Sequence, residues 1–150
     1  MNYIYASRSG NVEELVRSLE LNAWKITDGT ESVNEPFILF TYTDGHGQVP
    51  PVVSSFLERN HGYLKGVIVS GNMQRHGDTF CEAGTIISKK YGVPVIAQVD
   101  CQGGAKPQLP LQLSLFVNRF IPCFHRVSPF SYSAFVAVTF LLSGVAFIKL

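Results

Sequence analysis

Two nearly continuous apolar runs constrain the fold more than any other feature of this sequence. They read PFILFTYT, residues 36–43, and KGVIVSG, residues 65–71. Such runs are typical of strands that are buried on both faces of a parallel sheet, because crossover helices then cover each face. With 150 residues, the chain is long enough for one domain with a core of ordinary size. The runs therefore predict the centre of an α/β sheet.

The segments around these runs alternate between strand and helix patterns. Further strands are expected at residues 2–6, 23–27 and 93–100, and helices at residues 12–19, 52–64 and 79–92. Pro50 or Pro51 suits the first turn of the second helix, and Gly92 closes the third. This order predicts a doubly wound parallel sheet.

Charge and cysteine content exclude several classes of function. The net charge is +1 with neutral histidines, and no cluster of lysine and arginine marks a surface for nucleic acid. Cys81, Cys101 and Cys123 lack the spacing of a zinc site, so we expect free thiols in a reducing cytoplasm. No secretory signal is expected, because no charged segment precedes an apolar core at the N-terminus.

Three loops rich in small polar residues follow strands at the same edge of the predicted sheet. They cover residues 7–11, 43–49 and 70–77. In doubly wound sheets, ligands bind beyond the carboxyl ends of the strands. Ser7 and Ser9 precede a helix, and free N–H groups at a helix start bind phosphate. The alternative is that Ser9 or Asn11 only caps this helix.

The first loop favours a monophosphate over larger phosphate ligands. Its sequence, SRSGN, matches neither the GxxxxGK[ST] pattern of nucleoside triphosphate sites nor the GxGxxG pattern of dinucleotide sites. Because it contains no lysine, backbone N–H groups and hydroxyls would have to neutralise the phosphate. Flavin mononucleotide (FMN) carries one such phosphate.

The sequence resembles the flavodoxin-like NrdI proteins that serve class Ib ribonucleotide reductases. The resemblance is carried by SRSGNV, TYTDGHGQVP, GVIVSGN, GDTFCEAGTIISKKYGVPV and VDCQG, within residues 1 to about 104. It implies a flavodoxin-like fold and a redox accessory protein, rather than a stand-alone enzyme. Such a protein binds FMN, accepts electrons from a donor and uses dioxygen to supply superoxide or peroxide. Its partner is the reductase small subunit, whose dimanganese-tyrosyl radical cofactor it helps to assemble or maintain.

The resemblance also implies a set of cofactor-binding residues and no catalytic residue or metal ligand of the protein's own. They are Ser7, Arg8, Ser9, Gly10 and Asn11 around the phosphate, Thr43, Asp44, Gly45, His46 and Gly47 along the flavin edge that carries N5, and Ser70, Gly71, Asn72, His76 and Gly77 in the third loop. Glycine at 45 would let a peptide turn its carbonyl toward N5 when the flavin is reduced.

Two features depart from the family pattern. The third loop is one residue longer than usual and has His76 where the family has Trp or Phe, so this ring either stacks on the flavin or lies in solvent. Few charges lie near the flavin positions, which leaves Asp44 and Arg75 as the main local influences on flavin potential.

The C-terminal segment is the second departure. We expect a flavodoxin-like domain at residues 1–104 and an atypical apolar tail at residues 105–150 in place of the family's final helix. The tail has no Asp or Glu, and residues 127–148 carry no charge at all. A membrane anchor, a replacement for the last core helix and a segment from a shifted reading frame all remain open. Contact with a membrane is expected only if the tail is an anchor.

Two other functions remain open beside the role implied by the resemblance. One is a flavodoxin-like quinone reductase, which would need a pocket for a nicotinamide donor. The other is a membrane-tethered interaction protein that has lost its flavin.

Overall fold

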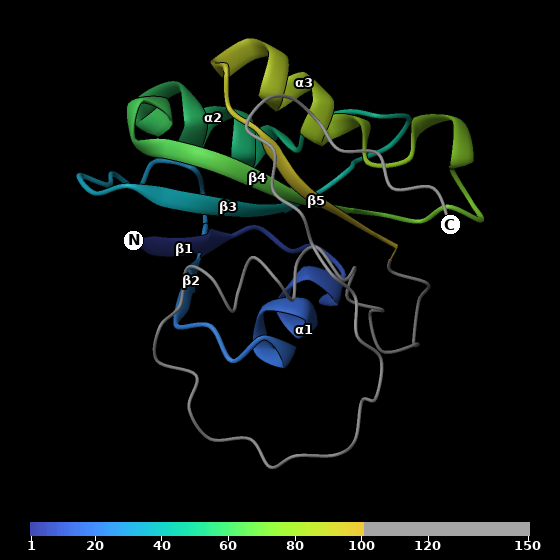
Figure 1. Ribbon diagram of the computed structural model, residues 1–150, viewed down its shortest axis with the longest axis horizontal. Coiled ribbons are helices and arrows are strands. Elements are labelled where there is room, and N and C mark those ends of the chain that lie inside the picture. The colour runs from blue at the N-terminus through green and yellow to red at the C-terminus, as the bar shows by residue number, and fades with distance from the viewer. Residues whose placement is uncertain (101–150) are drawn as a thin grey trace, which may run out of the picture.

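Five strands form one parallel sheet in the order β2–β1–β3–β4–β5 (Figure 1). The strands are β1 (Asn2–Tyr5), β2 (Ala23–Lys25), β3 (Phe37–Tyr42), β4 (Leu64–Gly71) and β5 (Val95–Asp100). The chain runs outward from β1 to β2, returns past β1 to β3, and then continues to β5 on the other side. This reversal is the doubly wound topology that the sequence predicts.

This computed structural model describes residues 1–100. The expected domain boundary at Gly104 and the expected tail at residues 105–150 lie outside the described residues. Among residues 1–100, no helix has both the length and the apolar character needed to cross a membrane.

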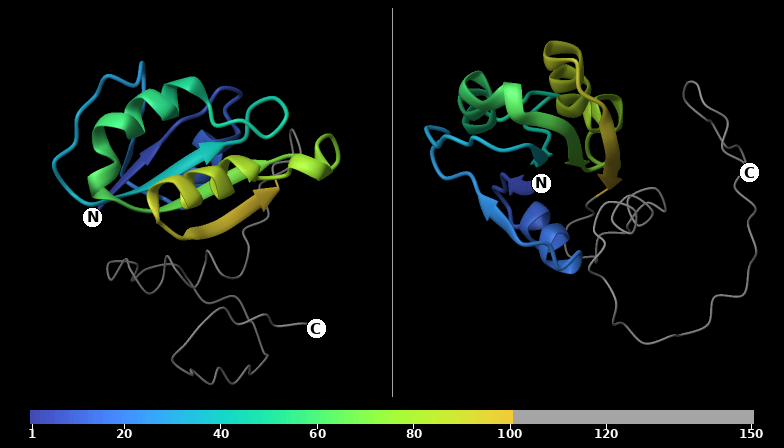
Figure 2. Two further views of the ribbon diagram at one scale, coloured as in Figure 1. Left: turned by 90° about the horizontal axis from the view of Figure 1, so that it is seen from above. Right: turned by 60° about the vertical axis from the view of Figure 1, so that its left-hand side comes forward.

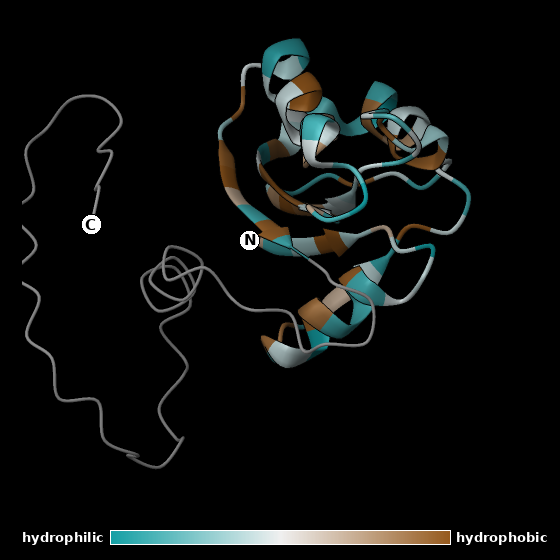
Figure 3. Cartoon of the chain, turned by 90° about the vertical axis from the view of Figure 1, so that its right-hand side faces the viewer, coloured by the Kyte–Doolittle hydropathy of each residue, from teal (hydrophilic) through white to brown (hydrophobic). Residues whose placement is uncertain are grey.

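Helices cover both faces of the sheet (Figures 1 and 2). α1 (Asn11–Ser18) lies on one face, while α2 (Pro51–Asn60) and α3 (Glu82–Tyr91) lie on the other. Two short 3-10 turns, η1 (His61–Tyr63) and η2 (Gly77–Thr79), precede β4 and α3. Apolar residues are concentrated in the strands and on the helix sides that face them (Figure 3).

The central strand β3 is buried on both faces, as its apolar run predicts. Phe37 and Leu39 pack in the layer beneath α2 and α3, whereas Ile38 and Phe40 pack against α1. All four side chains are at most 2% exposed. Phe56 of α2 meets Phe37 edge to face, with ring centroids 5.6 Å apart. Because successive side chains of a strand point to opposite faces of the sheet, the apolar residues of β3 contribute alternately to two cores.

Asn60 ends α2 four residues earlier than the sequence pattern predicts. Its side-chain amide donates to the carbonyl oxygens of Phe56 and Glu31, both at 2.8 Å, and its Oδ1 accepts the N–H of Val33 at 2.8 Å. A buried amide that is satisfied by these three bonds anchors the loop before β3 to the end of the helix. The predicted extension to residue 64 was wrong because Leu64 joins β4.

The start of α3 also differs from the predicted start at residue 79. Gly77–Thr79 form a 3-10 turn, and Cys81 has a left-handed backbone with a φ of 57°. A residue in this conformation cannot continue a helix, so α3 begins at Glu82. Gly92 ends the helix with a φ of 68°, as predicted.

Gly84 allows α3 to pack closely on β4. A Cβ atom at this position would lie 2.6 Å from Cγ1 of Val69. We expect Gly84→Val to lower the free energy of unfolding by about 1–3 kcal/mol, because the added atoms overpack a full core. Urea denaturation measures the effect. Gly62→Val is the matched control, since nothing lies within 4 Å of its Cβ position; equal losses in the two variants would contradict this packing role.

Candidate functional site

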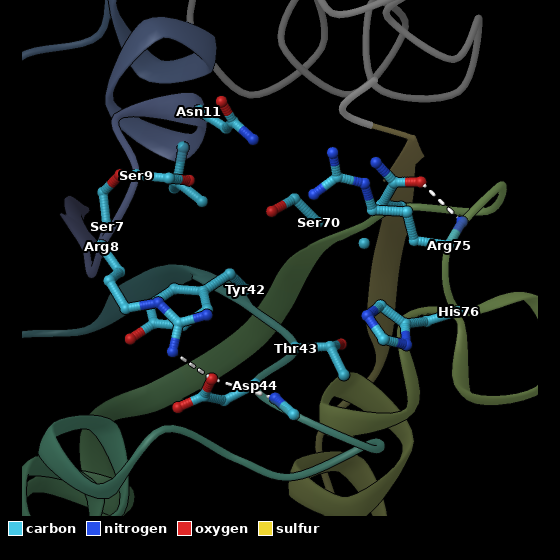
Figure 4. A pocket seen from close by; sticks show the side chains of 14 residues that line it. Ser7, Arg8, Ser9, Asn11, Tyr42, Thr43, Asp44, Ser70, Arg75 and His76 are labelled. Carbon is cyan, nitrogen blue, oxygen red and sulfur yellow. Dashed lines mark hydrogen bonds and ion pairs between the residues drawn. The ribbon is translucent and has the colours of Figure 1, made fainter. Parts of the chain in front are cut away.

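A cavity of about 520 Å³ lies at the carboxyl ends of β1, β3 and β4 (Figure 4). The three loops that the sequence singles out converge on it, as predicted. Its wall is formed by Ser7, Arg8, Ser9, Asn11, Val12, Tyr42, Thr43, Asp44, Gly45, Ser70, Gly71, Asn72, Arg75 and His76. The cavity is within the range of roughly 300–1,000 Å³ that is usual for small-molecule sites.

The first loop presents the start of α1 to the cavity. Gly10 is the N-cap residue, with a left-handed φ of 87°, and makes no side-chain cap hydrogen bond. The alternative that Ser9 or Asn11 is a side-chain cap was therefore wrong. Ser7 accepts a long hydrogen bond, 3.4 Å, from the N–H of Glu13. The positive end of the helix dipole thus faces the cavity beside two serine hydroxyls.

The second loop is a tight turn that is closed by its own backbone. The N–H of Asp44 donates to the carbonyl oxygen of Gln48, and the N–H of Gln48 donates to that of Asp44, both at 2.8 Å. Gly45 and Gly47 have φ values of 48° and 93°. At Gly47, a Cβ would lie 2.4 Å from a carboxylate oxygen of Glu82. The left-handed backbone therefore favours glycine at 47, whereas the exposed side chain of Glu82 could move away from a Cβ atom.

The third loop follows the buried Ser70 at the end of β4. The carbonyl oxygen of Ser70 accepts the N–H of Thr43 at 2.9 Å, which joins the second and third loops at their bases. Oδ1 of Asn72 accepts the N–H of Arg75 at 2.9 Å, and a carboxylate oxygen of Asp100 accepts the N–H of Met73 at 3.2 Å. These bonds hold the loop so that the side chain of Arg75 points into the cavity (Figure 4).

The charged groups of the cavity differ in whether they are paired. The guanidinium of Arg8 forms an ion pair with the carboxylate of Asp44 and lies over the ring of Tyr42, 5.5 Å from its centroid. Arg75 makes no ion pair within residues 1–100. The described wall of the cavity therefore carries one compensated pair and one uncompensated positive charge.

The environment of Tyr42 raises the pKa of its hydroxyl. Burial is the largest cause, and the negative charge of Asp44 acts in the same direction. The positive charge of Arg8 opposes both. The pKa of Tyr42 thus reports on the ion pair beside it.

Most of the residues predicted from sequence line the cavity, but four do not. Gly10, His46, Gly47 and Gly77 lie in the same loops without forming its wall. His46 and His76 meet at right angles, with ring centroids 5.8 Å apart, so the two loops touch through these rings. This contact does not distinguish between the two roles expected for the His76 ring, which are stacking on the flavin and exposure to solvent.

The cofactor-binding residues expected from sequence omit three wall residues, Val12, Tyr42 and Arg75, of which Arg75 was named only for its charge. Val12 was assigned only to the helical pattern of α1, and Tyr42 only to the apolar run of β3. Tyr42 could have been found from its place, since the residue before a ligand-binding loop lies at the edge of the sheet. No signal in the sequence distinguishes Val12 from the other apolar residues of the helix.

The residues that line the cavity fit a ligand with a phosphate and several hydrogen-bonding atoms. The open start of α1 suits the phosphate. Oγ1 of Thr43 is buried and has no hydrogen-bond partner within the described residues. A buried hydroxyl is rarely left unsatisfied, so this group supports a polar ligand atom beside it.

Comparison with known protein families identifies the family to which the chain belongs. The sequence model of the NrdI flavodoxin-like family matches residues 3–108. The chain belongs to the NrdI flavodoxin-like family. The match covers every described element of the sheet and all three loops of the cavity, and it extends four residues beyond the expected boundary at Gly104.

The fold is similar to that of a solved flavodoxin structure. A short-chain flavodoxin associated with a bacterial microcompartment has 19% sequence identity and a TM-score of 0.50, over 78% of this chain and 93% of its own. A mutant flavodoxin from Fusobacterium nucleatum bound to FMN has 22% identity and a TM-score of 0.45, over 69% of this chain and 70% of its own. At such identities, the first similarity concerns the fold alone, and the second carries no argument.

Family membership confirms the fold class and the cofactor predicted from sequence. The protein is an FMN-binding flavodoxin-like protein. In sheets with the strand order found here, FMN binds at the reversal between β1 and β3, which is where the cavity lies.

The pKa of Tyr42 tests the electrostatics of the site. We expect Asp44→Asn to lower this pKa, because the charge that raises it is removed, and Arg8→Gln to raise it, because the opposing charge is lost. NMR titration of the tyrosine rings measures both shifts. Tyr3, whose pKa is raised by burial alone, is the internal control. Shifts of Tyr42 in the same direction in both variants would contradict the assignment.

Proposed function

We propose that this protein is a redox accessory protein of class Ib ribonucleotide reductase in the cytoplasm. Bound FMN supplies one- and two-electron redox chemistry and reacts with dioxygen once it is reduced. The oxidant or the electrons would serve to assemble or maintain the dimanganese-tyrosyl radical cofactor of the reductase small subunit. A separate electron donor would reduce the flavin.

The observation that carries this proposal is the family match over residues 3–108. It spans the three cavity loops and nearly all of the sheet, and the resemblance described above links this family to the reductase.

The rim of the cavity supports delivery to another protein. Met73 is 49% exposed, and the rings of His46 and His76 are exposed on neighbouring loops. Exposed apolar and aromatic groups beside a cofactor site are common in surfaces that dock a protein. A partner that binds here would cover the opening through which electrons or a small oxidant leave.

The cavity residues would divide the binding of FMN among the three loops. Ser7, Ser9 and Asn11, with the backbone at the start of α1, would hold the phosphate. The second and third loops would enclose the flavin ring, with Thr43, Gly45 and Asn72 among the residues beside it. This division follows the assignment expected from sequence except at Arg8, and Val12, Tyr42 and Arg75 complete the wall.

Activation of the reductase small subunit tests the proposed function. The FMN-loaded protein, reduced with dithionite and mixed with the manganese-loaded cognate small subunit and dioxygen, should generate the tyrosyl radical detected by electron paramagnetic resonance. Free reduced FMN at the same concentration is the control. A radical yield no higher than with free FMN would contradict the proposal. Rapid NADH oxidation with a quinone would instead favour the quinone reductase.

The phosphate assignment is tested by comparing FMN with riboflavin, which lacks the phosphate. We expect Ser7→Ala combined with Ser9→Ala to weaken FMN binding, since each hydrogen bond to a charged phosphate is worth roughly 1.5–3 kcal/mol. Riboflavin affinity should not change. Fluorescence titration measures both constants.

Ser18→Ala is the matched control for this measurement. Ser18 is the last residue of α1, the helix that follows the two serines, and its hydroxyl donates to the carbonyl oxygen of Leu15 at 2.7 Å, away from the cavity. An equal loss of FMN and riboflavin affinity in the double serine variant would place the phosphate elsewhere.

A further inference from the structure

We propose that Arg8 is a positioning residue that fixes the second cavity loop through Asp44, and is not a ligand of the FMN phosphate. This inference rests on the proposed assignment of the cavity to FMN. It differs from the sequence-based expectation, which placed Arg8 among the residues around the phosphate.

One carboxylate oxygen links the first loop to the second. Oδ1 of Asp44 accepts a hydrogen bond from Nη1 of Arg8, and the same atom accepts the backbone N–H of Gly45 at 2.9 Å. The carbonyl oxygen of Asp44 is held at the same time by the N–H of Gln48, at 2.8 Å. The peptide between residues 44 and 45 is therefore held by hydrogen bonds at both its C=O and its N–H group. Arg8 orients the Asp44 side chain, which accepts the N–H.

The surroundings of Arg8 favour this orientation. Its guanidinium lies over the ring of Tyr42, at 5.5 Å from the centroid, and beside Asp44 (Figure 4). Asn11, the first residue of α1, lies above Arg8 in this view and away from Asp44. A planar guanidinium gains from both contacts, because it stacks on the aromatic ring while it donates to the carboxylate.

The charges in the cavity support the same conclusion. A phosphate could attract Arg8 only in competition with Asp44, whose side chain is 23% exposed and would then lose its ionic partner. The start of α1 and the serine hydroxyls offer the phosphate other donors. The arginine side chain is 66% exposed, so the pair has a modest effect on overall stability and a larger one on the order of the loop.

Riboflavin affinity distinguishes a positioning residue from a phosphate ligand. If Arg8 positions the second loop, Arg8→Gln should weaken riboflavin binding by about two- to fivefold, the range expected for a partly exposed ion pair. Asp44→Ala should do the same. Because both changes break the Arg8–Asp44 pair and Asp44→Ala also removes the acceptor of the Gly45 N–H, the double variant should bind riboflavin no more weakly than Asp44→Ala alone.

The double variant also distinguishes an effect of loop order on flavin binding from an effect of charge on the FMN phosphate. Removing Arg8 and Asp44 together leaves the net charge of the two loops unchanged, so the ratio of FMN to riboflavin affinity should equal that of the unmodified protein. Arg8→Lys should restore most of the riboflavin affinity, since an ammonium group can still pair with Asp44. Arg17→Gln, which removes an exposed arginine paired with Glu13 on α1, is the matched control and should bind both flavins normally.

The amide of Gly45 provides a readout that needs no ligand. In Arg8→Gln, its proton resonance should shift upfield and its hydrogen exchange should become faster, while both stay unchanged in Arg17→Gln. Normal riboflavin affinity in Arg8→Gln, with a loss for FMN alone, would show that Arg8 binds the phosphate and would overturn the proposal. Unchanged affinity for both flavins, or tighter FMN binding in Asp44→Ala, would also overturn it. None of these measurements involves the reductase, so the proposed function can fail independently.

Discussion

The parallel pairing of β1 with β3 is the interaction on which the rest of the site depends. It aligns Tyr5 with Phe40, and the pairing of β3 with β4 aligns Tyr42 with Ser70. Because the strands run in one direction, the loops that follow them leave the sheet at one edge. A shift of either pair by one residue would exchange the side chains of β3 between the two cores and displace the loops relative to one another.

Each of the three loops that follow these strands supplies a different kind of group to the cavity. The first offers the N-terminus of α1, the second a closed turn with two left-handed glycines, and the third the side chain of Arg75. Since Arg8 is compensated by Asp44, the positive charge on the described wall that is free to act on a bound ligand is that of Arg75. Such a charge favours whichever redox state of a ligand is more negative.

The sequence was sufficient for the order of the elements and for the convergence of the loops, because both follow from long apolar runs and from the direction of parallel strands. Contacts between distant residues could not be read in the same way. Asn60, the last residue of α2, bonds to Glu31 and Val33 in the loop before β3, which no local pattern reveals. Arg8 occupies the expected loop, yet its direction depends on Asp44, 36 residues away. Local sequence patterns thus predict the order of the strands and helices, while the direction of a side chain depends on tertiary contacts.

A crystal structure of the protein with FMN is the most direct test of the central claim, which is that the cavity at the carboxyl edge of the sheet holds this cofactor. The account predicts that the phosphorus atom lies at the start of α1, against residues 7–11, and that the flavin ring lies between residues 42–45 and 70–76. FMN bound in the smaller cavity between α2 and α3, which is lined by Leu57 and Ile87, would contradict it.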